Sequence, residues 1–534
     1  MKKFDYSLSQ DLFRHILNHA KEIVFSLLAI GINILSIYFM TTRQEFYSFS
    51  SAFFFYSLLL VVLCFGLPLA GSYLLLRYSL ENDNRTVLII RRLIVVWMGI
   101  LGLVGAIIMI IGGYPLSNLC SIGGNGSAFY RTVLVLSLAI WMHAMATAIR
   151  SFYLCQRRKA FACSLWISSL VPIFFNILAY MICTKFLAIT FLPSPIAAVG
   201  ILLGGACSFF YLYRYDQLHS RNIHSMALAQ KQRATYRTSL VKELFSIASS
   251  TMTISFLTAL PFLLALFLFV PLNHTLSADA LIMEGSGISC VYILVFLLIP
   301  MAFVGCIRPA KRFIKFDIYD KNRKLACSLE DIILSVLFFA AFFGGFLFFL
   351  AKPLAILLEF NEIVTTFLSL SGLLMIFVSC SIVSINIMSF CGYKHDLIIY
   401  LAIACIGSVV ATVLLAPKIG LFSVLIGLFL QQAILLFLCI NHMSNRYELD
   451  CMRIVQIILR TFLAVICANG IYAAAKLFLP FLILEKGPYL FITICICILL
   501  SFGVYVFAGV RLYIFRMIYH KNFRELWKEL FHAS

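Results

Sequence analysis

Cationic and neutral polar side chains are the groups within the apolar stretches of this sequence that could bind a substrate. No Asp or Glu occurs from Asn84 to Tyr215. A cation- or proton-coupled transporter usually needs a carboxylate within the membrane, whereas a guanidinium presents a planar fork of donors that fits phosphate oxygens. The pattern therefore favours a path for an anion. The candidate substrate-binding residues are Arg77, Arg308, Arg150, His143, Asn33 and Asn386.

Each candidate also has a purely structural interpretation. The arginines lie near the ends of apolar runs, where long side chains reach the headgroups. His143 lies near the middle of its run and could contact a substrate, take part in proton transfer, or bond to a neighbouring helix. The asparagines commonly bridge helices. Pro68, Pro261 and Pro300 free backbone carbonyls and permit bending, which makes them candidate hinges.

The elements that carry these residues are apolar runs of membrane-spanning length. The chain is 63% hydrophobic and 12% charged, with a mean hydropathy of +1.02. Apolar area at this density cannot be covered by polar surface in water, so we expect an integral membrane protein. Fourteen runs, from Ile23–Met40 to Tyr489–Val510, match the ~20 residues that a helix needs to cross a ~30 Å hydrocarbon layer. The predicted fold class is an all-α, polytopic membrane protein.

An internal repeat predicts how these helices are organised. The stretch Phe-Gly-Leu-Pro-Leu-Ala at Phe65–Ala70 recurs as Leu-Ile-Pro-Met-Ala at Leu298–Ala302. A second pair of prolines, Pro115 and Pro353, keeps nearly the same spacing. Duplicated membrane bundles are typical of transporters with a substrate path between two pseudo-symmetric lobes. The predicted parts are a cytoplasmic amphipathic N-terminus at 1–22, an N-terminal six-helix lobe at 23–213, a cytoplasmic linker at 214–243, a C-terminal six-helix lobe at 244–440, two additional transmembrane helices at 441–510 and a cytoplasmic amphipathic tail at 511–534.

The distribution of basic residues predicts the orientation. With fourteen spans, all but seven of the 41 Lys and Arg residues fall on the side that holds both termini. Basic residues accumulate on the cytoplasmic side, so both termini are predicted to be cytoplasmic. This bias, together with attraction to anionic headgroups, accounts for the net charge of +19 without nucleic-acid binding. The segments at both termini alternate apolar and basic residues and resemble helices that lie on the membrane face.

Enzymatic and metal chemistry find no support in the sequence. The seventeen cysteines form no metal-binding pattern, and most lie in apolar runs, where cysteine behaves as a small hydrophobic residue. There is no glycine-rich phosphate loop, and the longest polar stretch, about 30 residues between Arg214 and Glu243, is too short for a catalytic domain. We therefore expect no enzymatic activity, no metal and no cofactor.

Three stretches resemble a known family. Phe65–Asn84 resembles the Gly-Leu-Pro-Leu-Ala-x-Ser-Lys segment of polysaccharide-export flippases, and the second copy, which includes Asp317–Arg323, resembles its counterpart in the second lobe. Lys418–Gly427 is similar to a glycine-rich stretch late in that lobe. Where the family usually has Lys and Glu in the first motif, this chain has Tyr73 and Arg77. The family is the multidrug/oligosaccharidyl-lipid/polysaccharide (MOP) exporter superfamily.

The resemblance implies a function. It implies two six-helix lobes around a cavity that opens alternately to each side, with two extra helices as in fourteen-span members such as lipid II flippases. The expected activity is translocation of a polyprenyl-pyrophosphate-linked saccharide, a polysaccharide repeat unit or peptidoglycan precursor, across the cytoplasmic membrane of a bacterium. Arg77 and Arg308 are the first choices for contact with phosphate. The expected partners are the lipid-linked substrate, the bilayer and cell-envelope glycosyltransferases or polymerases.

Two other functions stay open at this stage. A cation-coupled multidrug antiporter of the same superfamily would share the fold, although the first lobe lacks a carboxylate for the coupling ion. A membrane scaffold for cell-envelope synthesis that does not transport would keep the same hydropathy. Ion-driven efflux of a cationic substrate would identify the antiporter, and the absence of any transport would identify the scaffold.

Overall fold

The structure is a computed structural model, and its described residues are helical apart from short turns and connections. It describes residues 28–81, 83–119, 126–153, 158–220, 225, 237–272, 277–293, 324–420, 422–447, 449–478, 488–519 and 522–525. None of these residues is in a strand. The all-α fold class predicted from the sequence is confirmed.

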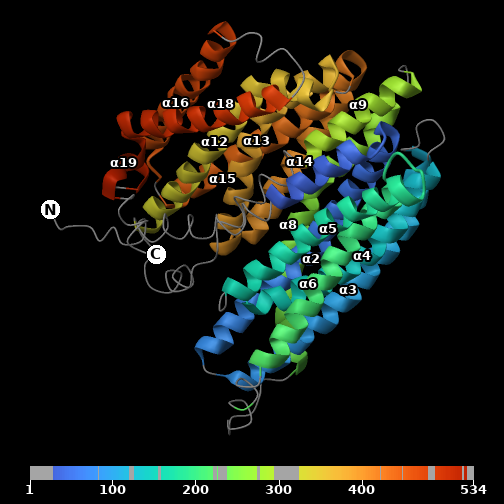
Figure 1. Ribbon diagram of the computed structural model, residues 1–534. Helices are drawn as coiled ribbons and strands as arrows, with labels where there is room; N and C mark the ends of the chain where they lie inside the picture. Colours follow the sequence, from blue (N-terminus) through green and yellow to red (C-terminus); the bar gives the residue numbers. More distant parts are fainter. Residues whose placement is uncertain are drawn as a thin grey trace, which may run out of the picture. The chain divides into compact units, whose positions relative to one another are not determined.

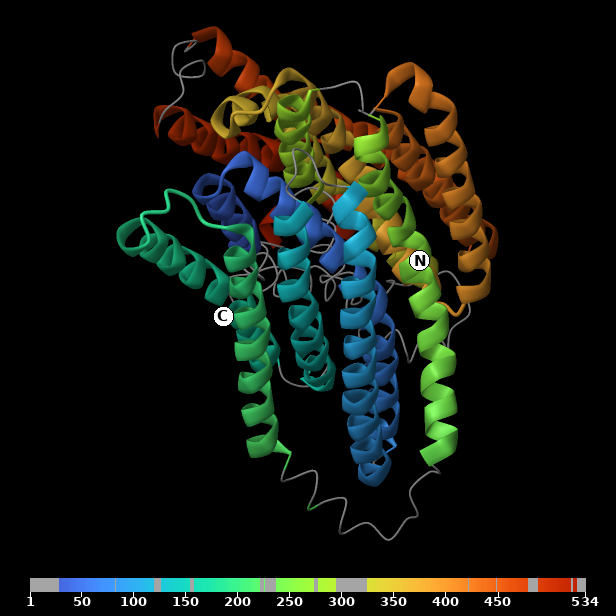
Figure 2. The same ribbon diagram turned by 90° about the vertical axis from the view of Figure 1, so that its right-hand side faces the viewer.

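Long helices make up the molecule (Figures 1 and 2). A short apolar helix at Leu28–Met40 comes first. The helices that follow are α2 (Arg43–Leu80), α3 (Asn84–Leu119), α4 (Gly126–Tyr153), α5 (Arg158–Phe186), α6 (Ser194–His219), α8 (Arg237–Leu272), α9 (Ala278–Val291), α12 (Lys324–Leu358), α13 (Glu362–Phe390), α14 (Lys394–Ile419), α15 (Phe422–Tyr447), α16 (Cys451–Phe478), α18 (Pro488–Arg511) and α19 (Ile514–Tyr519).

Twelve helices within the described ranges are long and apolar enough to cross a membrane. The first predicted run, Ile23–Met40, is described only as the helix Leu28–Met40, and the eighth, Gly285–Ile307, is described only where α9 ends and up to residue 293. Each of the remaining twelve runs falls largely within one of the twelve long helices. Most helices extend beyond their runs, because helical hydrogen bonding continues into the headgroup region where polar residues are tolerated. The predicted run Ser51–Leu76, for example, lies inside the longer helix α2.

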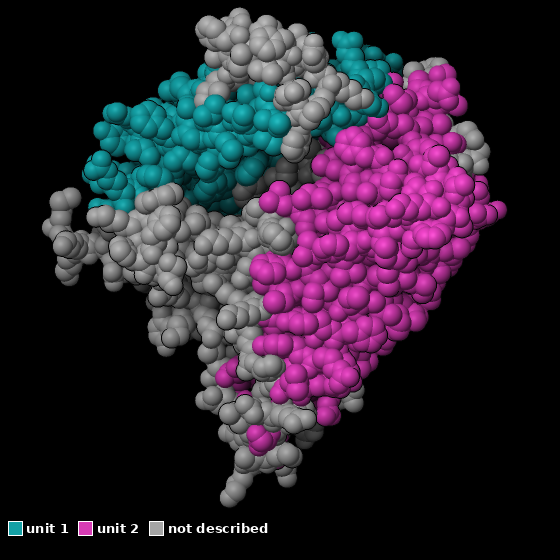
Figure 3. Space-filling model, viewed as in Figure 1, with its two compact units in different colours: residues 1–22, 294–393, 406–534 teal, residues 23–293, 394–405 magenta. Residues whose placement is uncertain are grey.

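Two compact units divide the chain, and Figure 3 colours them separately. Unit 2 comprises residues 23–293 and 394–405, and unit 1 comprises residues 1–22, 294–393 and 406–534. The helices α2 to α9 and the start of α14 therefore belong to unit 2, and the helices from α12 to α19 belong to unit 1 apart from that start. These units group residues by contact, so the lobe boundaries expected from the repeat stay a prediction.

Unit 2 is built around α4, which packs against α2, α3 and α6. α5 covers α6, and α8 packs along α2. The α5–α6 pair depends on small residues at intervals of four, because a Cβ at Gly204 would lie 2.7 Å from the carbonyl oxygen of Ser168 and 2.9 Å from Cγ of Pro172. Small residues at such intervals let membrane helices approach closely. Pro172 has no N–H to bond the Ser168 carbonyl within α5, so that oxygen is free to face α6.

The repeated motif at Phe65–Ala70 lies within α2, where it faces α8. A Cβ at Gly66 would lie 2.9 Å from the carbonyl oxygen of Ala248 and 2.6 Å from Cγ of Met252. Pro68 is buried inside α2, and the helix runs through it from Arg43 to Leu80. Pro261 is likewise buried within α8. The glycine of the motif thus permits close helix packing, while the hinge role of the prolines stays a prediction.

In unit 1, the close crossings of α12 with α13 and of α14 with α15 also depend on glycines. Gly344 and Gly372 face each other, and a Cβ at Gly372 would lie 2.6 Å from the Gly344 carbonyl oxygen. Gly427, within the stretch that resembles the family's late glycine-rich motif, lies against α14, where a Cβ would be 2.9 Å from the carbonyl oxygen of Ser408. Any larger residue at these positions would push the paired helices apart.

The last described helices pack on α12 through aromatic side chains. Tyr505 of α18 stacks on Phe338 of α12 with ring centroids 4.6 Å apart and donates a 2.6 Å hydrogen bond to the Phe338 carbonyl oxygen. Phe515 of α19 meets the edge of the same Phe338 ring at 5.3 Å. Aromatic pairs in this geometry add stability beyond the area they bury.

The short helix α19 lies in the segment that the sequence predicts to be an amphipathic tail. Ile514, Phe515, Ile518 and Tyr519 are buried in unit 1 with residues of α12 and α16. Burial raises the pKa of the Tyr519 hydroxyl, which keeps it neutral in this apolar setting. The apolar side of α19 therefore packs against α12 and α16, and residues 526–534 lie outside the described ranges.

Candidate functional site

A half-buried arginine in unit 2 lies among α4, α5 and α6. Arg150 of α4 donates from Nε to Ser164 Oγ of α5 at 3.1 Å and from Nη2 to Ser208 Oγ of α6 at 2.7 Å. Nη2 also donates to the Ser164 carbonyl oxygen at 3.1 Å. Both serines are fully buried. These three bonds fix the plane of the guanidinium.

Neither an ion pair nor a bond from Nη1 is present for Arg150 among the described residues. Its bonded partners are hydroxyl and carbonyl oxygens, which do not neutralise the charge. The Ser208 hydroxyl donates to the Ser164 carbonyl oxygen at 3.0 Å, which orients its lone pairs toward the guanidinium. Arg150 therefore presents an unneutralised cation with two unused donors on Nη1.

His143 lies two turns before Arg150 on the same face of α4, packed between α2 and α6. Its Nδ1 lies 3.0 Å from the carbonyl oxygen of Ala139, and its ring meets the edge of the Tyr56 ring of α2 at 6.0 Å. A Cβ at Gly205 of α6 would lie 2.5 Å from the same Nδ1. His143 thus fills a space that Gly205 leaves open, and its predicted contact with substrate stays a prediction.

Asn33 joins the helix Leu28–Met40 to α5. Its Oδ1 accepts a 3.0 Å hydrogen bond from Nδ2 of Asn176, and both side chains are buried. The Oδ1 of Asn176 has no described partner and faces Gly200, where a Cβ would lie 2.8 Å from it. This contact is a hydrogen bond between two side-chain amides on different helices, which is one of the interpretations that the sequence left open.

Arg77, the first choice from the sequence, is neutralised by carboxylates. At the end of α2 its Nη1 lies 2.9 Å from Glu243 Oε1 of α8, and its Nε lies 3.4 Å from Glu81. Tyr78 donates to the other oxygen of Glu243 at 3.4 Å. The Arg77 side chain is 50% exposed. In this arrangement the guanidinium ties α2 to α8, and two of its nitrogens already face carboxylates.

We expect replacement of Arg77 by glutamine to change stability little. An ion pair this exposed typically contributes 0–1 kcal/mol, because water screens it and ordering the side chains costs entropy. The free energy of unfolding should therefore fall by less than about 1 kcal/mol. A double-mutant cycle with Glu243→Gln measures the coupling, and a coupling above about 2 kcal/mol would contradict this assignment.

A second arginine network in unit 2 was not predicted from the sequence. Arg91 of α3 pairs with Asp216 of α6 at 3.1 Å, and Tyr153 of α4 donates to the same carboxylate oxygen at 2.5 Å. The Arg91 guanidinium also lies over the Phe152 ring, 4.6 Å from its centroid. The network joins α3, α4 and α6 at one end. Unlike Arg150, Arg91 has its own carboxylate.

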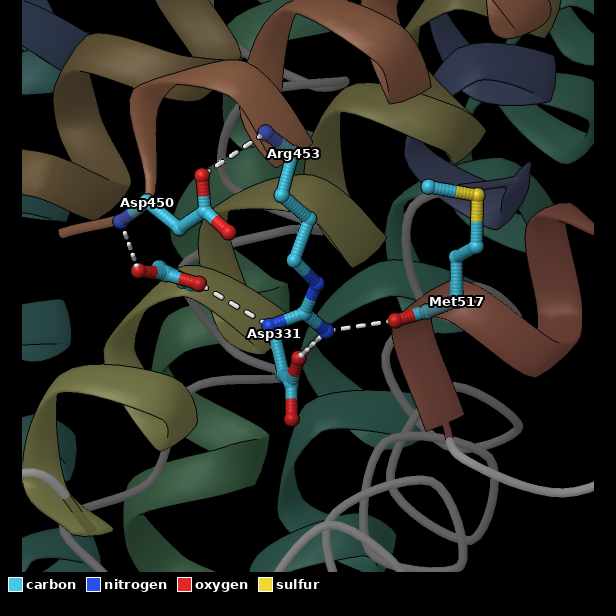
Figure 4. Close-up of polar contacts among 5 residues, drawn as sticks. Asp331, Asp450, Arg453 and Met517 are labelled. Carbon is cyan, nitrogen blue, oxygen red and sulfur yellow. Dashed lines mark hydrogen bonds and ion pairs between the residues drawn. The ribbon is translucent and has the colours of Figure 1, made fainter.

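Unit 1 holds the most extensive charged network among the described residues (Figure 4). Arg453 near the start of α16 pairs with Glu330 of α12 at 2.9 Å and with Asp331 at 2.7 Å, and it also donates to the carbonyl oxygen of Met517 in α19. Asp450 accepts from the Arg453 backbone N–H at 3.1 Å. Both α12 carboxylates are almost fully buried. One guanidinium therefore holds three helices together.

The other unit 1 candidate from the sequence takes no part in this network. Asn386 of α13 is half-buried and donates from Nδ2 to the carbonyl oxygen of Ile382 in its own helix at 2.8 Å. Arg308 and Pro300 lie outside the described residues. The structure thus brings His143 and Arg150 onto one face of α4, while Asn33, Arg77 and Asn386 belong to separate contacts.

Solved structures of similar shape decide the fold. No protein-family model and no curated protein sequence matches the chain. The lipid II flippase MurJ in an inward closed conformation matches with a TM-score of 0.58, at 14% identity over 93% of this chain and 99% of that chain. A eukaryotic MATE transporter, AtDTX14, matches with a TM-score of 0.60, at 16% identity over 85% of this chain and 100% of that chain. The chain has the MOP exporter fold.

Other solved MATE transporters agree with this assignment. An outward-facing multidrug resistance MATE transporter of the MOP superfamily matches with a TM-score of 0.56, at 12% identity over 86% of this chain and 99% of that chain. The resemblance to the MOP superfamily, seen first in Phe65–Asn84, is therefore confirmed at the level of the fold. At these identities the likeness lies in the path of the backbone, and it spans both the flippase and the MATE transporters.

Metal chemistry has no candidate centre in the MOP fold of this chain where the structure describes it. Within those ranges no three His, Cys, Asp or Glu side chains lie close enough to hold a metal ion. Each cysteine whose side chain is described is a free thiol.

Proposed function

We propose that this chain is a flippase that moves a polyprenyl-pyrophosphate-linked saccharide outward across the cytoplasmic membrane by alternating access. The cargo is a polysaccharide repeat unit or a peptidoglycan precursor, and the membrane is that of a bacterium. The MOP fold supports the transport mechanism, because its two pseudo-symmetric lobes can rock around a central path. The observation that carries the choice of cargo is an unneutralised guanidinium in spans without carboxylates, from Asn84 to Tyr215.

The energetic cost of moving a charged headgroup across a membrane agrees with this charge pattern. Moving an ion from water into hydrocarbon costs at least several kcal/mol, so a pyrophosphate headgroup needs a polar path while its polyprenyl tail stays in lipid. Cationic and hydroxyl groups along such a path replace the headgroup's hydration. An interior-negative potential adds about 2.3 kcal/mol per charge per 100 mV in the outward direction. Cell-envelope glycosyltransferases or polymerases would supply or consume such a cargo.

The remaining candidate residues take supporting roles in this proposal. Pro68, Pro261 and Pro300 are the hinges about which the helices bend, and Arg308 supplies a cation from the second lobe. His143, Asn33 and Asn386 line or brace the path. Both termini lie in the cytoplasm, as the distribution of basic residues predicts.

One observation favours a second candidate, the cation-coupled antiporter. Glu284 lies within α9 with 3% of its surface exposed. A buried carboxylate in a membrane helix is the kind of group that binds a coupling ion. Replacement of Glu284 by glutamine should therefore abolish ion-driven efflux if the chain is an antiporter, and should leave flipping unaffected if it is a flippase.

Proteoliposomes distinguish the candidates directly. A polyprenyl-pyrophosphate disaccharide with a fluorescent sugar is placed in both leaflets, and a membrane-impermeant reductant added outside measures how fast inner-leaflet lipid reaches the surface. The flippase proposal predicts complete reduction without an ion gradient, whereas empty liposomes keep about half of the signal because the inner leaflet is protected. Efflux of a cationic dye driven by a Na⁺ or H⁺ gradient, with no flipping, would instead assign the antiporter. Failure of both assays in folded protein would leave the scaffold.

A further inference from the structure

We propose that Arg150, held by Ser164 and Ser208, is a binding site for a phosphate group in unit 2. The inference rests on the proposed function, since it names the side chain that would receive the cargo's pyrophosphate. It also changes the ranking of the arginines that the sequence suggested, because Arg77 is replaced as the phosphate contact of this unit.

The first support is that the guanidinium is already oriented. Nε and Nη2 are both occupied, by the hydroxyl of Ser164 at 3.1 Å and the hydroxyl of Ser208 at 2.7 Å. These hydroxyls are themselves fixed, because Ser164 Oγ donates to the Phe161 carbonyl oxygen at 2.7 Å and Ser208 Oγ donates to the Ser164 carbonyl oxygen at 3.0 Å. An arginine whose rotamers are fixed before binding loses less entropy when a ligand arrives.

The second support is the charge that remains. No carboxylate pairs with Arg150 in the described part of the chain, and Nη1 has no partner there. A cation inside a membrane span without a counter-ion is unfavourable, and such residues typically mark the path of a substrate or ion. The ligand that satisfies both the charge and the planar donors is an anion with several acceptor oxygens, for which phosphate is the natural fit.

The third support is the contrast with three arginines that are paired with carboxylates. Arg77 faces Glu243 and Glu81, Arg91 faces Asp216, and Arg453 faces two carboxylates. Each of these has its counter-ion built into the protein and an evident structural role. Arg150 has hydroxyls where the others have carboxylates, so it is held in position without being neutralised.

The same chemistry admits two sources of phosphate. Arg150 lies three residues before the end of α4, where the phosphodiester of an anionic phospholipid could reach it as well as the pyrophosphate of a lipid-linked saccharide. Both present oxygens to the same guanidinium edge, and competition between them identifies the source.

Binding of a short polyprenyl pyrophosphate tests the proposal without requiring transport. Tritium-labelled farnesyl pyrophosphate is titrated onto the purified full chain in zwitterionic nanodiscs, and bound label is measured by scintillation proximity. We expect Arg150→Ala to weaken binding by about tenfold or more, as expected for the loss of a hydrogen bond to a charged group. Arg150→Lys keeps the charge but loses the fork, so it should show an intermediate loss. Arg214→Ala, which removes an exposed arginine from α6, is the matched control and should bind within about twofold of wild type.

Each outcome decides something about the site. Equal affinity for wild type and Arg150→Ala would overturn the proposal, and so would an equal loss in Arg214→Ala. If Arg150→Ala does not fold, Arg150→Lys decides by the same titration, with unchanged affinity as the contradicting result. Displacement of the probe by excess phosphatidylglycerol would assign the site to a lipid headgroup, and resistance to it would assign the site to cargo.

The binding result tests the phosphate site independently of whether the chain is a flippase. Arginine-dependent binding in a protein that does not flip lipid would support the phosphate site and remove the flippase. Flipping that survives in Arg150→Ala together with unchanged binding would retain the flippase and remove this site from it.

Discussion

Replacement of Arg453 by methionine is expected to destabilise unit 1 by about 3–5 kcal/mol, the usual cost of removing one partner from a buried ion pair. Glu330 and Asp331 would remain almost fully buried without their counter-ion, and the Met517 carbonyl oxygen of α19 would lose its donor. The contacts of α12, α16 and α19 with one another would all weaken at once, because one guanidinium bonds to all three helices. Sodium dodecyl sulfate titration, followed by maleimide labelling of the buried thiols of Cys439 and Cys497, measures the loss.

Two further variants give this prediction its controls. Arg516→Met removes an exposed arginine of α19 and should change stability by less than about 0.5 kcal/mol. The triple variant Arg453→Met, Glu330→Gln and Asp331→Asn removes the whole charged network, and it should recover much of the loss because no buried charge is left unpaired. A single variant as stable as wild type would show that the network does not hold these helices together.

Replacement of Gly344 by alanine is expected to cost about 1–3 kcal/mol, the usual range for overpacking. The new methyl group would meet the backbone carbonyl oxygen of Gly372, which cannot rotate out of the way as a side chain can. α12 and α13 would have to separate at their closest approach. The same detergent titration measures the change in the free energy of unfolding.

The identical substitution at Gly503 is the matched control. Gly503 lies inside α18, and a Cβ there would meet no atom within 4 Å. Alanine should therefore be neutral or stabilise the helix by up to about 1 kcal/mol, because glycine is the poorer helix former. Equal effects at Gly344 and Gly503 would mean that close packing of α12 on α13 is unimportant.

The helices could be predicted from the sequence because a long apolar run has few alternatives in a membrane. A backbone in hydrocarbon must satisfy its own hydrogen bonds, so a run such as Leu93–Gly112 has to be helical, and the structure places it within α3. What the runs do not specify is where the helix ends. α3 begins nine residues before its run, because Asp83 accepts hydrogen bonds from the backbone N–H and the hydroxyl of Thr86.

The partners of the candidate residues could not be predicted, because they depend on which helices face one another. Arg150 bonds to Ser208, 58 positions away, and Arg77 pairs with Glu243, 166 positions away. Position within a motif ranked Arg77 above Arg150, but only the fold shows that one is neutralised and the other is not. A usable signal was present in α6, where Gly200, Gly204 and Ser208 recur every four residues and mark the face that meets α5.

The C-terminal tail shows a different limit of sequence analysis. An alternation of apolar and basic residues predicts an amphipathic helix equally well whether its apolar side meets lipid or protein. In the structure, Phe515 and Ile518 pack on α12 and α16, and Arg453 bonds to the backbone of α19. The charged residue that fixes this choice lies in another helix, so the pattern of the tail alone could not reveal it.

The central claim is that this chain moves an anionic lipid-linked saccharide past a cationic site in unit 2. The most direct measurement is the rate at which a fluorescent polyprenyl-pyrophosphate disaccharide crosses proteoliposomes that contain wild type, Arg150→Ala or Arg214→Ala at equal protein density. The account predicts rapid flipping by wild type and Arg214→Ala, and a loss of about tenfold or more in Arg150→Ala. No flipping by folded wild-type protein, accompanied by ion-driven efflux of a cationic dye, would contradict it.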